Sequence, residues 1–148
     1  MRKIDLAALI DSLCTDLDEI GKPVVWETHA AAPVQCRPNE IRRAVRNLIE
    51  NAVAYGSKAQ VRLDDTSGRY EVIVEDEGPG IPEAEHGRVF EPFVRLEASR
   101  SSETGGSGLG LTLVKAIAEG HGGTIMLENR KERGLRARLS LPRETAAA

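Results

Sequence analysis

Apolar residues recur at helical spacing in three segments of the chain. In each segment leucine, isoleucine, valine or alanine returns every three or four residues, which predicts an amphipathic helix. Asp5 precedes the first segment as an N-cap, and Gly56 follows the second as a C-terminal stop. The expected helices cover residues 6–20, 39–55 and 111–121.

Shorter segments rich in valine, isoleucine and threonine predict the strands, because β-branched residues between turn residues favour extended structure. Two of these segments flank Ser67-Gly68, which indicates a hairpin. The expected strands cover residues 24–28, 34–36, 60–64, 70–76, 124–128 and 135–141. This order of elements predicts a two-layer α/β sandwich, in which helices cover one face of a mixed sheet.

Length and composition fit a single domain. A chain of 148 residues is long enough to bury about two thirds of its unfolded surface. We expect one domain over residues 1–148, with ends that fray at residues 1–4 and 143–148. Lys and Arg total 20 against 23 Asp and Glu, and this net charge of -3 argues against general nucleic-acid binding.

Neither a membrane span nor a disulfide is expected. No apolar run approaches the roughly 20 residues that cross a bilayer, so the domain is expected to make no direct membrane contact. Cys14 and Cys36 lack the Cys-x-x-Cys spacing of a redox or zinc site. We expect both to be small apolar core residues in a reducing, cytoplasmic setting.

The first candidate for chemistry is a glycine-rich turn at the end of a predicted strand, Asp76-Glu77-Gly78-Pro79-Gly80. Gly78 and Gly80 have no Cβ, so the backbone can pass close to a flat ligand. An ionised Asp only accepts hydrogen bonds, and an exocyclic amine like that of adenine is a natural donor for Asp76. An ordinary polar β-turn is the alternative interpretation.

Two asparagines lie on one stripe of the second predicted helix. Asn47 and Asn51 are four residues apart, so their side chains lie one above the other. Asn is a poor helix former, because its side chain competes for backbone hydrogen bonds. The pair is either solvated and locally bonded, or its amide oxygens coordinate Mg²⁺ carried by the phosphates of a nucleotide.

A second glycine-rich segment, Thr104 to Leu111, leads directly into the third predicted helix. Free N–H groups and the positive end of the helix dipole favour an anion there, and phosphate is the obvious one. A flexible linker is the alternative, although Leu109 and Leu111 between the glycines disfavour it. The pattern is neither a Walker A motif nor a convincing dinucleotide fingerprint. Residues 97–108, which overlap the start of this segment, are predicted to form a mobile loop.

These motifs, in this order, resemble the catalytic ATP-binding domain of bacterial sensor histidine kinases. The wider GHKL superfamily also contains gyrase-type topoisomerases, heat-shock chaperone ATPases and mismatch-repair ATPases. The resemblance implies the Bergerat ATP-binding fold, with a mobile ATP lid. The boxes of the family correspond to residues 47–52, 76–80, 90–93 and 106–111, the third being Phe90-Glu91-Pro92-Phe93.

The resemblance also implies roles for individual residues. Asn51 would bind Mg²⁺, and Asn47 would assist through a phosphate or a water. Arg95 resembles the basic residue of the family near the γ-phosphate, where it would offset charge during transfer. Asp76 would accept from the adenine amine. The remaining nucleotide contacts implied are Tyr55, Gly78, Gly80 and Ile81 at the base or ribose, and Gly106, Gly108, Leu109, Gly110 and Leu111 at the phosphates.

Asn47 separates a kinase from an ATPase. The ATPase relatives carry a Glu at this position that activates water, whereas an amide accepts no proton at neutral pH. We therefore expect transfer of the γ-phosphoryl group to a histidine supplied from outside this domain. None of His29, His86 and His121 has the surroundings of a phosphoacceptor, and we expect surface or structural roles for them.

The implied partners follow from that resemblance. They are ATP, the dimerisation and phosphoacceptor helices of a parent kinase upstream, and then a response regulator. The parent would be anchored in the inner membrane. Ala54 departs from the family, because many relatives carry Lys or Arg there; its task could pass to Arg95, Arg100 or Lys115. Two alternatives remain open: a degenerate module that binds nucleotide without transfer, and a serine kinase of the anti-sigma type.

Overall fold

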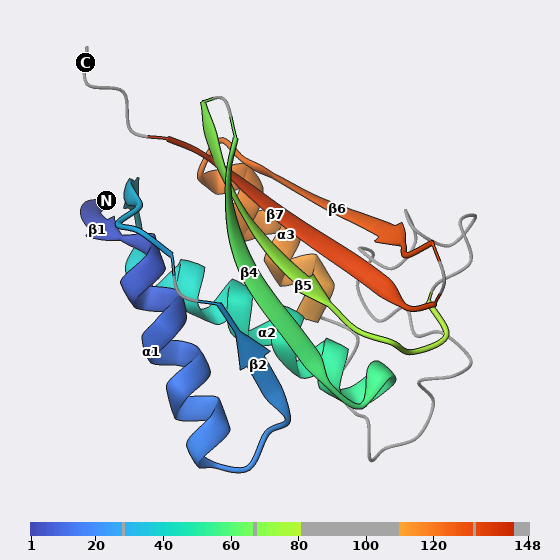
Figure 1. The fold of residues 1–148 in the computed structure, drawn as a ribbon. Helices are drawn as coiled ribbons and strands as arrows, with labels where there is room; N and C mark the ends of the chain where they lie inside the picture. Colours follow the sequence, from blue (N-terminus) through green and yellow to red (C-terminus); the bar gives the residue numbers. More distant parts are fainter. Residues whose placement is uncertain (28, 67, 81–109, 132, 144–148) are drawn as a thin grey trace.

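The centre of the molecule is a five-stranded mixed sheet (Figure 1). The structure is a computed structural model that describes residues 1–27, 29–66, 68–80, 110–131 and 133–143. The strand order is β2-β4-β5-β7-β6, where β2 and β4 are parallel and the other neighbours are antiparallel. The strands are β2 (Val24–Trp26), β4 (Ala59–Thr66), β5 (Arg69–Glu75), β6 (Thr124–Asn129) and β7 (Leu135–Pro142).

Three helices cover one face of this sheet, so the predicted two-layer sandwich is confirmed (Figure 1). They are α1 (Leu6–Glu19), α2 (Pro38–Gly56) and α3 (Gly110–Gly120). Asp5 caps α1 as expected, because its carboxylate accepts a hydrogen bond from Ala7 N at 3.0 Å.

Alternation along the strands places the core between the two layers. On the helix side of β5 and β7, Val72 lies opposite Leu139 and Val74 opposite Ala137, and all four are buried. The buried side chains of α2 cover them from the other layer. Each fully buried Leu, Ile or Val contributes about 1.5–3 kcal/mol, so this interface supplies most of the stability.

His121 links α2 to α3 at the end of the layer away from the glycine-rich turn. Its Nε2 accepts from Arg37 N at 3.0 Å, so Nδ1 carries the proton and donates to Ile117 O at 2.7 Å. The start of α2 therefore lies beside the end of α3, and the two helices run antiparallel. The structural role expected for His121 is observed.

The N-terminus departs from the expectation. Residues 1–4 were predicted to fray, but β1 (Arg2–Asp5) pairs antiparallel with β3 (Pro33–Cys36) in a separate two-stranded sheet. The physical reason is the ladder itself, together with the Asp5 carboxylate, which also accepts from Ala32 N at 2.9 Å.

The C-terminal end of the chain and the end of α2 also differ from the prediction. Arg143 does not fray, because its backbone N donates to Gly68 O at 3.0 Å and its guanidinium lies 2.8 Å from Asp65. Residues 144–148 lie outside the described part of the chain. Gly56 belongs to α2, and Ser57, at φ 67°, adopts the left-handed conformation that ends the helix.

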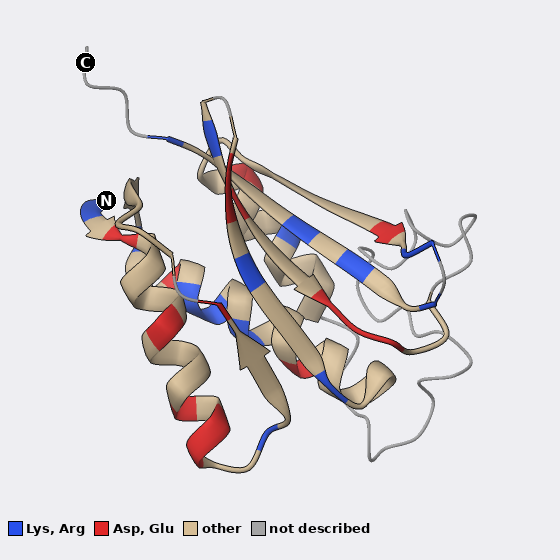
Figure 2. Cartoon of the chain, in the orientation of Figure 1, with Lys and Arg blue, Asp and Glu red and all other residues tan. Residues whose placement is uncertain are grey.

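Opposite charges alternate on the face of the sheet that the helices leave open (Figure 2). Glu75 is buried there beside Arg62 at 2.8 Å, Arg136 at 2.5 Å and Arg130 at 3.7 Å. Ile73 lies on the same face between Arg62 and Arg138 and is fully buried. Arginine stems and carboxylates therefore close this side of the sheet.

The expectation for the two cysteines is confirmed. Cys14 and Cys36 are free thiols buried in the core. No helix in the described part of the chain is long and apolar enough to cross a membrane.

Candidate functional site

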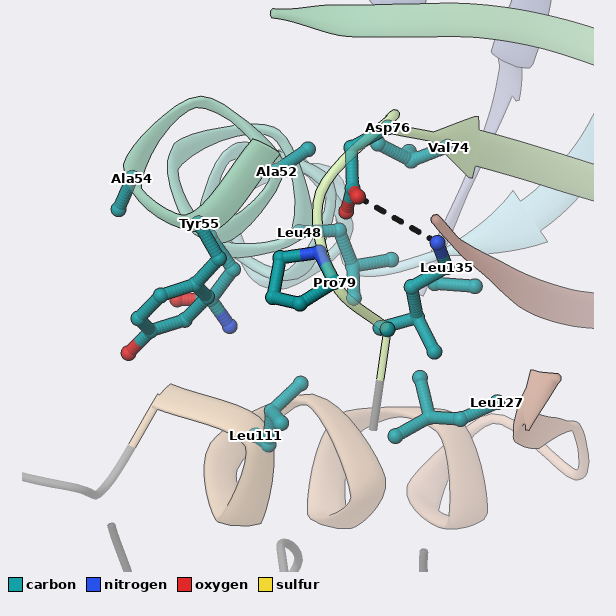
Figure 3. Close-up of a pocket in the computed structure, with 13 residues that line it drawn as sticks. Leu48, Ala52, Ala54, Tyr55, Val74, Asp76, Pro79, Leu111, Leu127 and Leu135 are labelled. Atoms are coloured by element: carbon teal, nitrogen blue, oxygen red, sulfur yellow. Dashed lines mark hydrogen bonds between the residues drawn. The ribbon is translucent and has the colours of Figure 1, made fainter. Parts of the chain in front are cut away.

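A pocket opens between the end of α2, the start of α3 and the sheet (Figure 3). The space that its walls enclose, with the solvent at its mouth included, is about 770 Å³. The lining residues are Leu48, Asn51, Ala52, Ala54, Tyr55, Val74, Asp76, Pro79, Gly80, Leu111, Leu127, Leu135 and Ala137.

Asp76 is the buried carboxylate of this pocket. It follows the last residue of β5 and is 6% exposed. Its Oδ1 accepts from Gly78 N at 2.8 Å and from Leu135 N at 3.3 Å, the second of which Figure 3 shows. Both hydrogen bonds from described residues end on Oδ1, so Oδ2 is the oxygen left to accept from a ligand.

Burial raises the pKa of Asp76 above its ordinary value, although the two backbone hydrogen bonds and the charge of Arg130 act in the opposite direction. A proton would go to Oδ2, because Oδ1 already accepts two N–H groups. The ionised form is therefore the one that accepts from an amine donor.

Glycine is required where the turn passes over the end of α2. A Cβ on Gly78 would lie 2.4 Å from Tyr55 O, and a Cβ on Gly56 would lie 2.3 Å from the Cβ of Asp76. Gly80 has φ +74°, and a Cβ there would lie 2.6 Å from Asn129 Oδ1. These contacts within the chain account for glycine at both positions, and the close approach of Gly78 and Gly80 to a flat ligand stays a prediction.

The asparagine helix supplies the opposite wall. Asn51 and Tyr55 line the pocket one turn apart, together with Leu48 and Ala52 of the same helix. Asn47 lies one turn earlier, and its Cγ would be 4.0 Å from a Cβ on Gly110. The two amides therefore follow α2 from the pocket toward the start of α3. Ala54 also lines the pocket, so the side chain at this family position carries no charge.

Of the second glycine segment, the structure describes Gly110 and Leu111. Gly110 is the first residue of α3, and Leu111 projects into the pocket (Figure 3). Ile81, Arg95, Gly106, Gly108 and Leu109 lie outside the described residues. So do the phenylalanine segment, residues 90–93, and the predicted lid.

Sequence reasoning missed the wall formed by β6 and β7. Leu127, Leu135 and Ala137 line the pocket, and Arg130 and Gly134 contact the backbone of Asp76. The expected strands did not show which residues lie beside Asp76, because that depends on the register of β7 against β5.

The residues fit a nucleotide bound with a divalent cation. Apolar walls suit a flat base, and the free carboxylate oxygen suits its amine. Amide oxygens are hard ligands of the kind that Mg²⁺ accepts. Within the described ranges, no three His, Cys, Asp or Glu side chains cluster as a metal site. Asn51 places such an amide in the lining of the pocket.

Comparisons with known proteins agree with this geometry. The family described as "Histidine kinase-, DNA gyrase B-, and HSP90-like ATPase" matches residues 36–145. The sensor histidine kinase GtrS of Pseudomonas aeruginosa is 42% identical over 114 residues, which are 77% of this chain and 23% of GtrS. The sensor protein BasS of Escherichia coli is 38% identical over 143 residues, which are 93% of this chain and 38% of BasS.

Solved structures show the same fold. The ATP-binding domain of PrrB from Mycobacterium tuberculosis has a TM-score of 0.79 and 31% identity, over 97% of this chain and 98% of that domain. The mycobacterial sensor histidine kinase MprB has a TM-score of 0.85 and 29% identity, over 97% of this chain and 99% of the other.

The fold is therefore the one predicted, that of histidine kinase ATP-binding domains. The chain spans 23% to 38% of the length of the curated relatives GtrS and BasS. The matched segment contains both asparagines, Asp76 and the start of α3, and family membership supports binding of ATP. The chain belongs to the histidine kinase-, DNA gyrase B- and HSP90-like ATPase family.

Proposed function

We propose that this domain binds ATP with Mg²⁺ and donates the γ-phosphoryl group to a histidine on a separate phosphoacceptor domain of a sensor kinase. The observation that supports it most is that one pocket is lined by Asn51, Asp76 and Leu111, which come from three separate motifs. A response regulator would then receive the phosphoryl group.

In the proposed complex the adenine lies between Tyr55 and the leucines of the sheet, with its amine on Asp76 Oδ2. Asn51, with Asn47 beside it, would hold Mg²⁺, which supplies positive charge to the phosphates. The start of α3 would offer backbone N–H groups to the same phosphates. Each contact places the γ-phosphoryl group without a covalent step on this domain.

The transfer itself is balanced as follows. A ring nitrogen of the acceptor histidine forms a bond to the γ-phosphorus, the bond from that phosphorus to the β,γ-bridging oxygen breaks, and ADP leaves. The attacking nitrogen is the one without a proton, and the other ring nitrogen then releases its proton to solvent, which removes the positive charge from the ring. Asn47 cannot take a proton from water, so hydrolysis is expected to be slow compared with transfer.

Incubation of the domain with the phosphoacceptor domain of its own parent kinase and γ-labelled ATP tests this function. Acid-labile, alkali-stable label on the acceptor is expected, and Asp76→Asn should abolish it at an ATP concentration that saturates the unchanged domain. Acid-stable label would indicate a serine kinase instead.

A second function, nucleotide binding without transfer, is favoured by one observation. Ala54 lines the pocket at a position where the resemblance implies a cation, so one phosphate contact is missing. Tight ATP binding in calorimetry, together with no label on the acceptor, would support this second function.

A further inference from the structure

The connection between β6 and β7 contacts Asp76 through Arg130 and Gly134. Arg130 N donates to Gly134 O at 2.8 Å, which closes the turn, and Gly134 has φ +101°. A Cβ on Gly134 would lie 1.9 Å from Asp76 O. Only glycine allows the turn to come this close to the carboxylate's own backbone.

Backbone groups of Leu135 hold Asp76 on one side. Asp76 N donates to Leu135 O at 3.0 Å, and Leu135 N donates to Asp76 Oδ1 at 3.3 Å. The second of these is long for a hydrogen bond, so by itself it fixes the carboxylate weakly.

Gly78 N also donates to Asp76 Oδ1, at 2.8 Å, and Arg130 adds a constraint on the backbone of Asp76. Its guanidinium donates to Asp76 O at 2.8 Å, and its Nε lies 3.7 Å from the buried Glu75 carboxylate. The guanidinium of Arg130 therefore contacts both Glu75, the last residue of β5, and Asp76, which follows it. Without this donor, the carbonyl of a buried residue would lose its partner, and the peptide group between Asp76 and Glu77 could turn about the single bonds on either side of it.

We propose that Arg130 is a positioning residue that sets the base selectivity of the pocket by fixing the direction of Asp76 Oδ2. The proposal rests on the proposed function, in which this oxygen accepts from the adenine amine. A base with a carbonyl in place of that amine would place its carbonyl oxygen against Oδ2. Both oxygens are hydrogen-bond acceptors, so an Oδ2 that is held in place rejects this base. A carboxylate that can turn away rejects it less.

The test compares affinities of the full chain for ATP and for inosine triphosphate, which has a carbonyl in place of the amine. Calorimetry with Mg²⁺ measures the ratio of the two dissociation constants. The unchanged chain is expected to prefer ATP by more than about tenfold, and Arg130→Gln should reduce the ratio about fivefold or more, because ATP loses a fixed acceptor and inosine triphosphate is rejected less. Affinity for ATP should fall, and affinity for inosine triphosphate should stay the same or rise.

Two further variants make the result specific. Arg130→Lys keeps the charge and one donor, so it should recover part of the ratio. Arg133→Gln removes a cation from the same turn, where the Arg133 side chain is exposed, and should leave the ratio unchanged. Thermal unfolding of every variant sets a temperature at which each is folded.

The outcomes separate this proposal from the function on which it rests. A preference for ATP that Arg130→Gln leaves intact, or an equal loss of both nucleotides, would overturn the positioning role alone. No preference in the unchanged chain would overturn that role together with the assignment of Asp76 to the base.

Discussion

Asp76 combines two demands that act against each other. Burial raises its pKa, so the ionised carboxylate costs stability, and this cost appears as the pH rises through the pKa of the folded state. Ligand binding needs the ionised form, because the proton would occupy Oδ2. The same residue is therefore expected to lower stability and raise affinity over one pH interval.

A pH series of ATP affinity tests this at the residue scale. As the pH falls from neutral toward the raised pKa of Asp76, the affinity of the unchanged chain should drop more steeply than that of Asp76→Asn. The variant shares the titration of the phosphates, so only the difference between the two slopes reports on Asp76. Parallel slopes in calorimetry would contradict the role of this carboxylate.

Asn51 gives a second prediction at this scale. Asn51→Ala should remove the effect of Mg²⁺ on ATP affinity, because the proposed amide ligand is lost while the apolar walls remain. Calorimetry with and without Mg²⁺ measures this. Arg46→Ala, on the exposed part of the same helix, is the matched control and should retain the full Mg²⁺ effect.

At the scale of elements, helices α1 to α3 and the strands of the main sheet were predictable, because each follows a local spacing of apolar residues. The pairing of β1 with β3 was not, since Arg2–Asp5 has only the partial burial of a short edge strand and its partner arrives about 30 residues later. The contact of Arg130 with Asp76 spans 54 positions and was missed for the same reason.

The end of α2 shows how contact between elements overrides local preference. Ala is a better helix former than Gly by about 1 kcal/mol, yet a Cβ on Gly56 would collide with the Asp76 side chain. Gly56→Ala should therefore lower both the free energy of unfolding and the ATP affinity.

Gly68 is the control that separates the effect of this collision from the effect of backbone strain. Gly68 has φ +76° but open space around its Cβ position, so Gly68→Ala should cost about 1–2 kcal/mol of strain without changing ATP affinity. Denaturant unfolding and calorimetry on both variants measure the two effects. Equal affinity in Gly56→Ala and the unchanged chain would contradict the contact.

At the scale of the whole molecule, Glu75 stabilises the face of the sheet that the helices leave open. Burial alone would raise its pKa, but the hydrogen bond from Arg136 and the charge of Arg62 outweigh it, and the pKa lies below its ordinary value. The stabilisation is thus present above the pKa of the unfolded state and is lost as the pH falls through that of the folded state.

Glu75→Gln leaves three arginines without their shared anion and should cost about 3 kcal/mol at neutral pH. The difference from the unchanged chain should shrink in acid, where Glu75 itself is protonated. Glu128→Gln is the control, because Glu128 is 39% exposed on the same face, and it should cost less than about 1 kcal/mol. Urea unfolding at several pH values measures both.

The pocket draws its walls from α2, the end of β5, the start of α3 and the β6–β7 hairpin, so its lining spans residues 48 to 137. A small molecule bound there contacts segments that are far apart in the sequence. Global unfolding of the domain therefore requires its release. Each hundredfold excess of free ligand over its dissociation constant adds about 2.7 kcal/mol to the folded state. The melting temperature of this domain should therefore rise when a nucleotide binds. This rise reports binding even of nucleotides from which no phosphoryl group is transferred.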